Sequence, residues 1–176
     1  LVLYTADAFD REENDEKFKK YIELLTPICK SFAAEQGFNV SVEAVQAHGG
    51  YGYCTEYGME QFVRDTKIAT IYEGTNGIQA IDFLMRKVLK DNAQTFTILQ
   101  GEIMKGLEEL PESLSKEKMI FMKALGSAKD AMTFLGEKAQ KKEMGIVLQS
   151  CKDFLDLSSH IVVAWRLMVS ANKAVS

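Results

Sequence analysis

Glu73 is the residue of this chain whose type and setting best suit chemistry. It stands in the run IYEGTNG, residues 71–77, between a tyrosine and a glycine. The glycines permit unusual backbone angles, and Thr75 or Asn76 can cap a following helix, whose first N–H groups lack partners. An apolar flank can desolvate a carboxylate and strengthen it as a base. The run therefore suits a general base acting on a weakly acidic carbon, whereas an isolated acid in a turn would be an ordinary solvated residue.

A second glycine-rich run, QAHGGYGY over residues 46–53, lies upstream, and Arg64-Asp65 stands between the two runs. Together they resemble the C-terminal α-helical domain of the acyl-CoA dehydrogenase flavoenzymes. That family shows a Gln with a Gly-Gly-x-Gly loop, then Arg-Asp, then Ile-Tyr-Glu-Gly-Thr, over about thirty residues. The residues beyond about Asn92 resemble the extra helical tail of a larger bacterial subgroup that includes the 3-methylthiopropionyl-CoA dehydrogenases.

The resemblance implies FAD-dependent oxidation of an acyl-CoA thioester to the trans-2-enoyl-CoA by a longer enzyme. By motif match, Glu73 is the base that removes the α-proton. Gly74 binds the substrate closely because it has no side chain to block the approach. The flavin accepts hydride from the β-carbon, and electron-transferring flavoprotein is the expected electron acceptor.

The resemblance also assigns residues to the cofactor. Six residues match the family's FAD-contacting segments: Gln46, Gly49, Gly50, Thr75, Asn76 and Gly77. The first three match the segment that touches the adenine-diphosphate part of FAD in a neighbouring subunit, which implies a homodimer or a homotetramer. An amide and two glycines suit a pyrophosphate-rich ligand. Many relatives carry Gln at the position of Gly77, so only a backbone role carries over to this glycine. Arg64-Asp65 is expected to order local structure.

Composition narrows the possible partners and the compartment. The chain is 47% apolar, which can fill a core, and its formal net charge of −4 argues against a nucleic-acid partner. No run of about 18 consecutive apolar residues is present, so no membrane span is expected. The three cysteines lack zinc-like spacing and are expected to be free thiols in the bacterial cytoplasm. The chain starts at Leu1 without a signal pattern, as expected for a piece cut from a longer protein.

Apolar periodicity predicts an all-α fold, an antiparallel helical bundle with short connections. A kink or break is expected at Pro27, and Asn39 or Ser41 is the expected cap of a separate short helix. Asn14 or Asp15 is the expected cap of the first long helix. Helical spacing covers the segments 18–37, 41–48, 57–71 and 76–90, the last with a possible continuation to residue 110.

Two long helices, over residues 115–141 and 143–173, are predicted beyond Pro111. The methionines of the tail, at positions 104, 119, 122, 132, 144 and 168, are expected in the core. We divide the chain into residues 1–91, an N-terminally truncated acyl-CoA dehydrogenase C-terminal domain, and residues 92–176, a helical extension that packs on it without ligand chemistry.

Two other functions compete with the dehydrogenase. A non-catalytic helical module could keep the glycine loop for oligomerisation, but a neutral residue would then be expected in place of Glu73. A flavin oxidase on the same fold would differ in the oxygen reactivity of its reduced flavin, which the residues present do not reveal.

Overall fold

The computed structural model describes residues 1–11 and 16–175 of the chain. These residues form helices joined by short turns, and no strand occurs among them, which confirms the predicted all-α class. The α-helices are α1 (Val2–Arg11), α2 (Glu16–Ala47), α3 (Gly50–Tyr53), α4 (Met59–Lys67), α5 (Asn76–Ile81), α6 (Gln94–Glu108), α7 (Ser115–Gln140), α8 (Met144–Gln149) and α9 (Cys151–Val175). The π-helix η4 (Asp82–Leu89) follows α5, and the short 3-10 turns are η2 (Thr55–Tyr57), η3 (Ile68–Thr70) and η5 (Glu112–Leu114).

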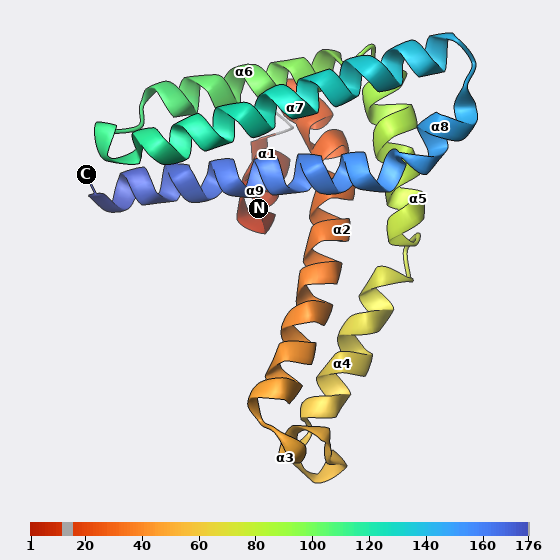
Figure 1. The fold of residues 1–176 in the computed structure, drawn as a ribbon, viewed down its shortest axis with the longest axis vertical. Coiled ribbons are helices and arrows are strands. Elements are labelled where there is room, and N and C mark those ends of the chain that lie inside the picture. Colours follow the sequence, from red (N-terminus) through yellow and green to blue (C-terminus); the bar gives the residue numbers. More distant parts are fainter. Residues whose placement is uncertain (12–15, 176) are drawn as a thin grey trace.

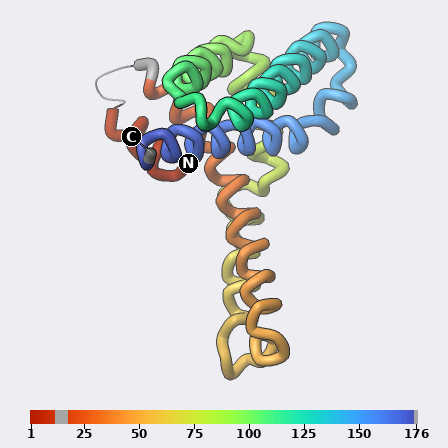
Figure 2. Tube along the Cα trace, turned by 60° about the vertical axis from the view of Figure 1, so that its left-hand side comes forward, coloured from red at the N-terminus to blue at the C-terminus, as the bar shows by residue number. Residues whose placement is uncertain are grey.

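The helices form two parts that point in different directions (Figure 1). In the first part, α6 and α7 both pack against α9. In the second, α2 and α4 run antiparallel as a hairpin whose tip is α3. Figure 2 shows this hairpin projecting from the rest of the molecule as an arm. The helix α2 contacts α4 in the arm and also α5, α6 and α9, so one helix links both parts.

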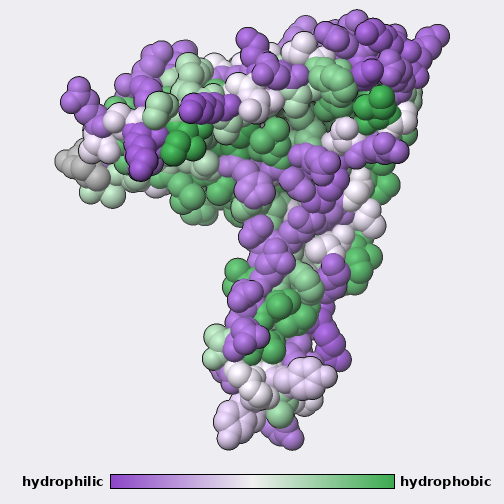
Figure 3. Space-filling model, viewed as in Figure 1, coloured by the Kyte–Doolittle hydropathy of each residue, from purple (hydrophilic) through white to green (hydrophobic). Residues whose placement is uncertain are grey.

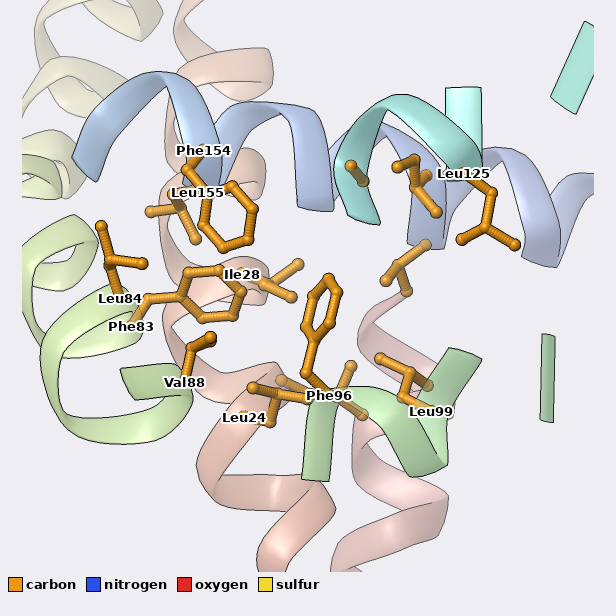
Figure 4. Packing of buried hydrophobic residues seen from close by; sticks show 14 of the residues in the cluster. Leu24, Ile28, Phe83, Leu84, Val88, Phe96, Leu99, Leu125, Phe154 and Leu155 are labelled. Atoms are coloured by element: carbon orange, nitrogen blue, oxygen red, sulfur yellow. The ribbon is translucent and has the colours of Figure 1, made fainter. Parts of the chain in front are cut away.

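One hydrophobic cluster holds the helices together where the arm meets the other helices (Figure 4). Ile28 of α2 lies in it beside Phe83 of η4, Phe96 of α6 and Phe154 of α9. The centroids of the three phenylalanine rings lie 5.8 to 6.4 Å apart, within the range at which aromatic pairs attract. The cluster draws on residues before and after position 92, so the tail packs on the motif-bearing helices as expected.

The middle of α2 differs from the prediction. The expected break at Pro27 and the expected cap at Asn39 or Ser41 are both wrong, because α2 is a single helix of 32 residues. The Ser41 hydroxyl donates to the carbonyl four residues earlier, at 2.9 Å, inside this helix. Leu25 and Ile28, on either side of the proline, are fully buried. Tertiary packing of this face offsets the hydrogen bond that Pro27 cannot make.

Three other boundaries can be compared with the prediction. The proposed continuation of a helix to residue 110 is wrong, because Asn92 and Ala93 adopt a left-handed backbone conformation and separate η4 from α6. Similarly, Ser150 separates α8 from α9 within the segment predicted as one helix. The helix predicted over residues 115–141 is confirmed by α7. The expected cap at Asn14 or Asp15 lies outside the described residues.

The methionines of the tail divide into two groups. Met119 and Met122 are exposed on α7, so the prediction that they belong to the core is wrong. The other four pack against the hydrophobic cluster while remaining partly accessible: Met104, Met132, Met144 and Met168. The difference follows the helix face, because the buried stripe of α7 passes through Phe121, Leu125 and Ala128 instead.

Within the described residues, α9 is the one helix long and apolar enough to cross a membrane by length and composition. It also contributes Phe154, Leu155, Ile161 and Trp165 to the hydrophobic cluster. A buried core helix meets the same criterion, so its composition is weak evidence for a membrane span.

Candidate active site

Glu73 lies in the turn between η3 and α5, where the arm joins the rest of the molecule (Figure 1). Its φ is 55° and that of Gly74 is 84°, so two successive residues adopt the left-handed conformation. This conformation costs a residue other than glycine roughly 1–2 kcal/mol. The Glu73 side chain is exposed and is therefore accessible to a ligand from outside this chain. Backbone strain at an accessible acid supports the choice of Glu73 as a functional residue.

Two side chains hold the carbonyl groups of this turn. The Lys30 ammonium, from the middle of α2, donates to the Gly74 carbonyl at 2.7 Å and to the Asn76 side-chain oxygen at 2.9 Å. The Gln79 amide, from α5, donates to the Glu73 carbonyl at 3.1 Å. The peptides before and after Gly74 are thus each bonded to a different helix.

The start of α5 fixes the other end of the turn. The Thr75 hydroxyl accepts a hydrogen bond from the Ile78 N–H at 3.2 Å, which confirms the predicted helix cap. Asn76 is 6% exposed, and its amide donates to Glu35 Oε1 at 3.1 Å and to the Ser31 carbonyl at 3.5 Å. The side chain of Asn76 is engaged within the chain, so the cofactor contact predicted for it would come from its backbone.

A line of charged side chains continues from Asn76 to α9. Glu35 pairs with Lys152 of α9 at 2.9 Å, and Lys152 pairs with Asp156 at 2.6 Å. Burial raises the pKa of Glu35, but the hydrogen bonds from Lys152 and Asn76 outweigh it and hold this pKa below its usual value. Burial likewise lowers the pKa of Lys152, whereas its bonds to Asp156 and Glu35 raise it to a net value above the usual one.

Sequence reasoning missed Lys30, Glu35 and Lys152. A signal for the first of them was available, because Lys30 is the one charged residue between positions 24 and 34. A lone charge on a helix that otherwise reads as core indicates a specific partner. The partners that tie these residues to the turn and to one another lie 41 to 117 residues away in the chain and could not be assigned.

Two hollows border the turn. One, of about 280 Å³, is lined by Lys30, Ala33, Ala34, Ala69, Tyr72 and Glu73. The other, of about 390 Å³, is lined by Glu35, Phe38, Asn39, Lys67, Thr70, Thr75, Asn76 and Gly77. Glu73 therefore borders a different hollow from Thr75, Asn76 and Gly77, three of the six residues predicted to contact FAD. A single turn can in this way face two ligand groups at once.

The remaining cofactor candidates lie at the far end of the arm. Gln46, Gly49 and Gly50 are all exposed there, and Gly49 has a φ of 60°. A Cβ atom at either glycine would meet no other atom within 4 Å, so the backbone is open to a ligand. Gln46 and Lys30 stand sixteen residues apart on one helix, about 24 Å at 1.5 Å per residue. The structure does not bring the tip residues and Glu73 together, which is compatible with contacts to flavins of different subunits.

The other polar candidates serve local structure. Arg64 pairs with Glu60 at 3.2 Å, and Gln61 donates to Asp65 at 3.3 Å, so each member of Arg64-Asp65 bonds to the preceding helical turn, as predicted. His48 is exposed just after α2, and its ring is hydrogen-bonded to the Ala44 carbonyl of that helix. In the part of the chain that the structure describes, no three His, Cys, Asp or Glu side chains are placed to hold a metal. The predicted free thiols are confirmed for Cys29, Cys54 and Cys151.

Several known proteins are similar to this chain in sequence. The family model for the acyl-CoA dehydrogenase C-terminal domain matches residues 1–88. The chain is 32% identical over 170 residues to 3-methylmercaptopropionyl-CoA dehydrogenase of Ruegeria pomeroyi, covering 91% of this chain and 28% of that protein. It is 34% identical over 108 residues to the broad-specificity linear acyl-CoA dehydrogenase FadE5 of Mycobacterium tuberculosis, covering 60% of this chain and 18% of that protein.

The fold also matches solved structures. ACDH-11 of Caenorhabditis elegans, solved in complex with C11-CoA, aligns with a TM-score of 0.73 and 19% identity over 96% of this chain and 29% of that one. The structure described as Bd2924 apo-form aligns with a TM-score of 0.67 and 24% identity over 95% of this chain. These likenesses show a shared fold. The chain spans less than a third of the length of the relatives named here.

Proposed function

The chain belongs to the acyl-CoA dehydrogenase family, whose C-terminal domain matches residues 1–88, and from this premise we propose that it is part of an FAD-dependent enzyme that oxidises an acyl-CoA thioester to the trans-2-enoyl-CoA. The observation that carries the proposal is the turn at Glu73, where an exposed carboxylate stands on a left-handed backbone beside a hollow. Two relatives named as dehydrogenases of acyl-CoA compounds support the reaction class.

In this proposal Glu73 removes the α-proton of the thioester, and Gly74 lets the substrate lie close to the backbone. A base for a weakly acidic carbon works best in a dry pocket. The exposed Glu73 side chain receives no such cover from residues 1–11 and 16–175, which the structure describes. The remaining domains of the longer protein therefore supply it, and we expect the 176-residue chain alone to bind FAD weakly.

The residues present fit a flavin dinucleotide. The open backbone at Gly49 and Gly50 and the exposed amide of Gln46 suit the pyrophosphate part of a cofactor bound to a neighbouring subunit. Thr75 and Gly77 border the hollow beside Lys67, where hydroxyl, backbone and ammonium donors meet. When bound, FAD supplies the acceptor for the hydride.

An oligomer is part of the same proposal. Apolar side chains remain exposed along the arm, where Figure 3 shows green surface, and tyrosine side chains, which the hydropathy scale of that figure colours pale purple, are exposed near its tip. They include Tyr51, Tyr53, Tyr57, Phe62 and Ile71. Exposed apolar surface of this kind marks contact areas. Its presence supports a homodimer or homotetramer, in which other domains and a second subunit cover the arm.

The test is Glu73→Gln in the full-length enzyme. The amide keeps the shape of the side chain but cannot take a proton, so flavin reduction by an acyl-CoA should slow by about 10²- to 10⁴-fold. Flavin content should stay normal. Glu43→Gln, an exposed acid elsewhere on α2, is the matched control. Flavin reduction at the wild-type rate in Glu73→Gln would show that Glu73 is not the base.

The full-length wild-type enzyme also distinguishes a dehydrogenase from the flavin oxidase alternative. We expect turnover with electron-transferring flavoprotein and slow reaction of the reduced flavin with oxygen. Fast reoxidation by oxygen would identify an oxidase. The non-catalytic alternative is disfavoured by the left-handed backbone at Glu73, because Gly or Asn adopts this conformation at lower cost.

A further inference from the structure

We propose that Lys30 is a positioning residue of the candidate active site, which fixes the direction of the Glu73 carboxylate by holding the turn that follows it. This inference rests on the proposed function of Glu73 as the base. Lys30 lies 44 residues before Gly74 in the chain, so the contact exists only in the folded protein.

Lys30 holds the turn at two points. One ammonium group bonds to the backbone of Gly74 and to the side chain of Asn76, and so it spans Thr75. Gly74, at a φ of 84°, has no side chain that could fix its peptide by packing. The orientation of this peptide therefore depends on its hydrogen bonds, and Lys30 supplies the one to its carbonyl. The Gly74–Thr75 peptide shares the Gly74 Cα with the peptide that follows Glu73. A Gly74 carbonyl held in place therefore restricts the backbone from which the Glu73 side chain extends.

The chemistry of a lysine side chain suits this place. An ammonium has three donors and no acceptor, so it can bond to both oxygens at once. Lys30 is half-buried, and burial lowers its pKa, while the nearby Glu73 and Glu35 carboxylates act in the opposite direction. Hydrogen bonds from a charged donor are stronger than those between neutral groups. The side chain thus gives two strong bonds at the edge of the hollow that Glu73 borders.

Asn76, one of the two acceptors of Lys30, is itself held in place. Asn76, which accepts one of the two bonds, donates to Glu35, and Glu35 pairs with Lys152 of α9. The turn is in this way tied to two long helices rather than to its own neighbours alone. A turn anchored on rigid helices keeps a reacting group in place, and misplacement by about 1 Å can cost about 10²-fold in rate.

The experiment compares Lys30→Met, Lys30→Gln and Lys30→Arg in the full-length enzyme. Lys30→Met removes both bonds, so kcat and the rate of flavin reduction should fall by roughly 10- to 100-fold. The KM for acyl-CoA and the flavin content should stay within about twofold of wild type, because binding contacts are unchanged. Lys30→Arg keeps charged donors and should recover most of the rate. Lys19→Met, an exposed lysine on the same helix, is the control and should behave as wild type.

The outcomes are decisive in each case. Wild-type kcat in Lys30→Met, or a loss of rate explained by lost flavin or raised KM, overturns the positioning role. If Lys30→Met does not fold, Lys30→Gln replaces it. The neutral glutamine amide tolerates partial burial but is shorter than lysine and uncharged. A wild-type rate in Lys30→Gln also overturns the proposal. Glu73→Gln is measured in parallel. If it retains activity, the proposed base is wrong; if it is inactive while Lys30→Met is normal, only the role of Lys30 fails.

Discussion

Lys152 of α9 and Glu35 of α2 form an ion pair with nitrogen and oxygen 2.9 Å apart, although the two residues are separated by 117 positions in the chain. Glu35 also accepts a hydrogen bond from Asn76, which begins the helix after the candidate base. The C-terminal segment, which carries no recognisable chemical motif, therefore helps to hold the turn of the candidate active site.

The Glu35–Lys152 pair should contribute modestly to stability. Both side chains are about one third exposed, so we expect a coupling of roughly 0.5–1 kcal/mol in a double-mutant cycle of Glu35→Gln and Lys152→Met. Urea unfolding of the four proteins measures it. Effects of the two changes that simply add would mean that the pair is not coupled.

Glu73→Gly should be more stable than Glu73→Ala, although both variants lack the carboxylate proposed as the base. Glycine adopts the left-handed backbone at position 73 without the penalty that glutamate has there, although it also loses more freedom on folding. We expect the free energy of unfolding of Glu73→Gly to exceed that of Glu73→Ala by roughly 0.5–1 kcal/mol. Glu73→Ala removes the same carboxylate but keeps the Cβ. Thermal unfolding of the two variants gives the answer. Equal melting temperatures would indicate that the turn is not strained in solution.

Asp91 should stabilise the start of α6 in a pH-dependent way. Its carboxylate accepts two hydrogen bonds at 2.7 Å, from the N–H and the hydroxyl of Thr95, and the backbone bond is the main reason that the pKa of Asp91 lies below its usual value. A lowered folded-state pKa means that the contribution is full above the usual pKa of 3.8 and is lost as pH falls through the folded-state value. Asp91→Ala should cost about 1 kcal/mol at neutral pH.

The measurement for Asp91 is denaturant unfolding at neutral pH and at steps into acid. The difference between wild type and Asp91→Ala should shrink as the medium becomes more acidic. A difference that stays constant throughout would show that the carboxylate does not act through its charge.

Gly106→Ala should destabilise the packing of α6 on α9. A Cβ atom at this position would lie 2.8 Å from Nε1 of Trp165, which is buried beside Tyr4. Overpacking of this kind costs about 1–3 kcal/mol, against a gain of up to about 1 kcal/mol in helix propensity. Gly101→Ala, on the same helix with no atom within 4 Å of the added carbon, should instead stabilise.

The single tryptophan of the chain makes this prediction easy to follow. Its fluorescence should change in Gly106→Ala and not in Gly101→Ala. Unaltered emission together with wild-type stability in Gly106→Ala would mean that the indole ring moves aside without loss.

The sequence predicted those features that depend on neighbours along the chain. The helix over α7 followed from its apolar stripe, and the cap of the helix after Glu73 was narrowed to Thr75 or Asn76, of which the structure selects Thr75. The break expected at Pro27 did not occur because residues far along the chain bury that face of α2. Local propensity indicates where a helix is weak, but tertiary packing decides whether it ends there.

The residues of the candidate site likewise fall into two groups, those that local sequence identifies and those that only the fold identifies. Glu73 and the glycine runs were found from short motifs. By contrast, Lys30 lies 44 residues from its partner Gly74, and Lys152 lies 117 residues from its partner Glu35. A charge on an apolar helix predicts that a partner exists, but only the fold identifies it. The assignment of ligand contacts to Gln46, Gly49, Gly50, Thr75, Asn76 and Gly77 stays a prediction.

The unbroken course of α2 limits how the length of this protein can change during evolution. Lys30, beside the candidate base, and Gln46, near the glycine loop, stand on one helix, in which each residue adds about 1.5 Å and turns the chain by about 100°. Inserting one residue between them would rotate the glycine loop to another side of the arm, and α4, which packs along α2, would lose its register. We therefore expect homologues of this chain to keep the spacing between these two positions constant and to vary in length at the tip or in the tail.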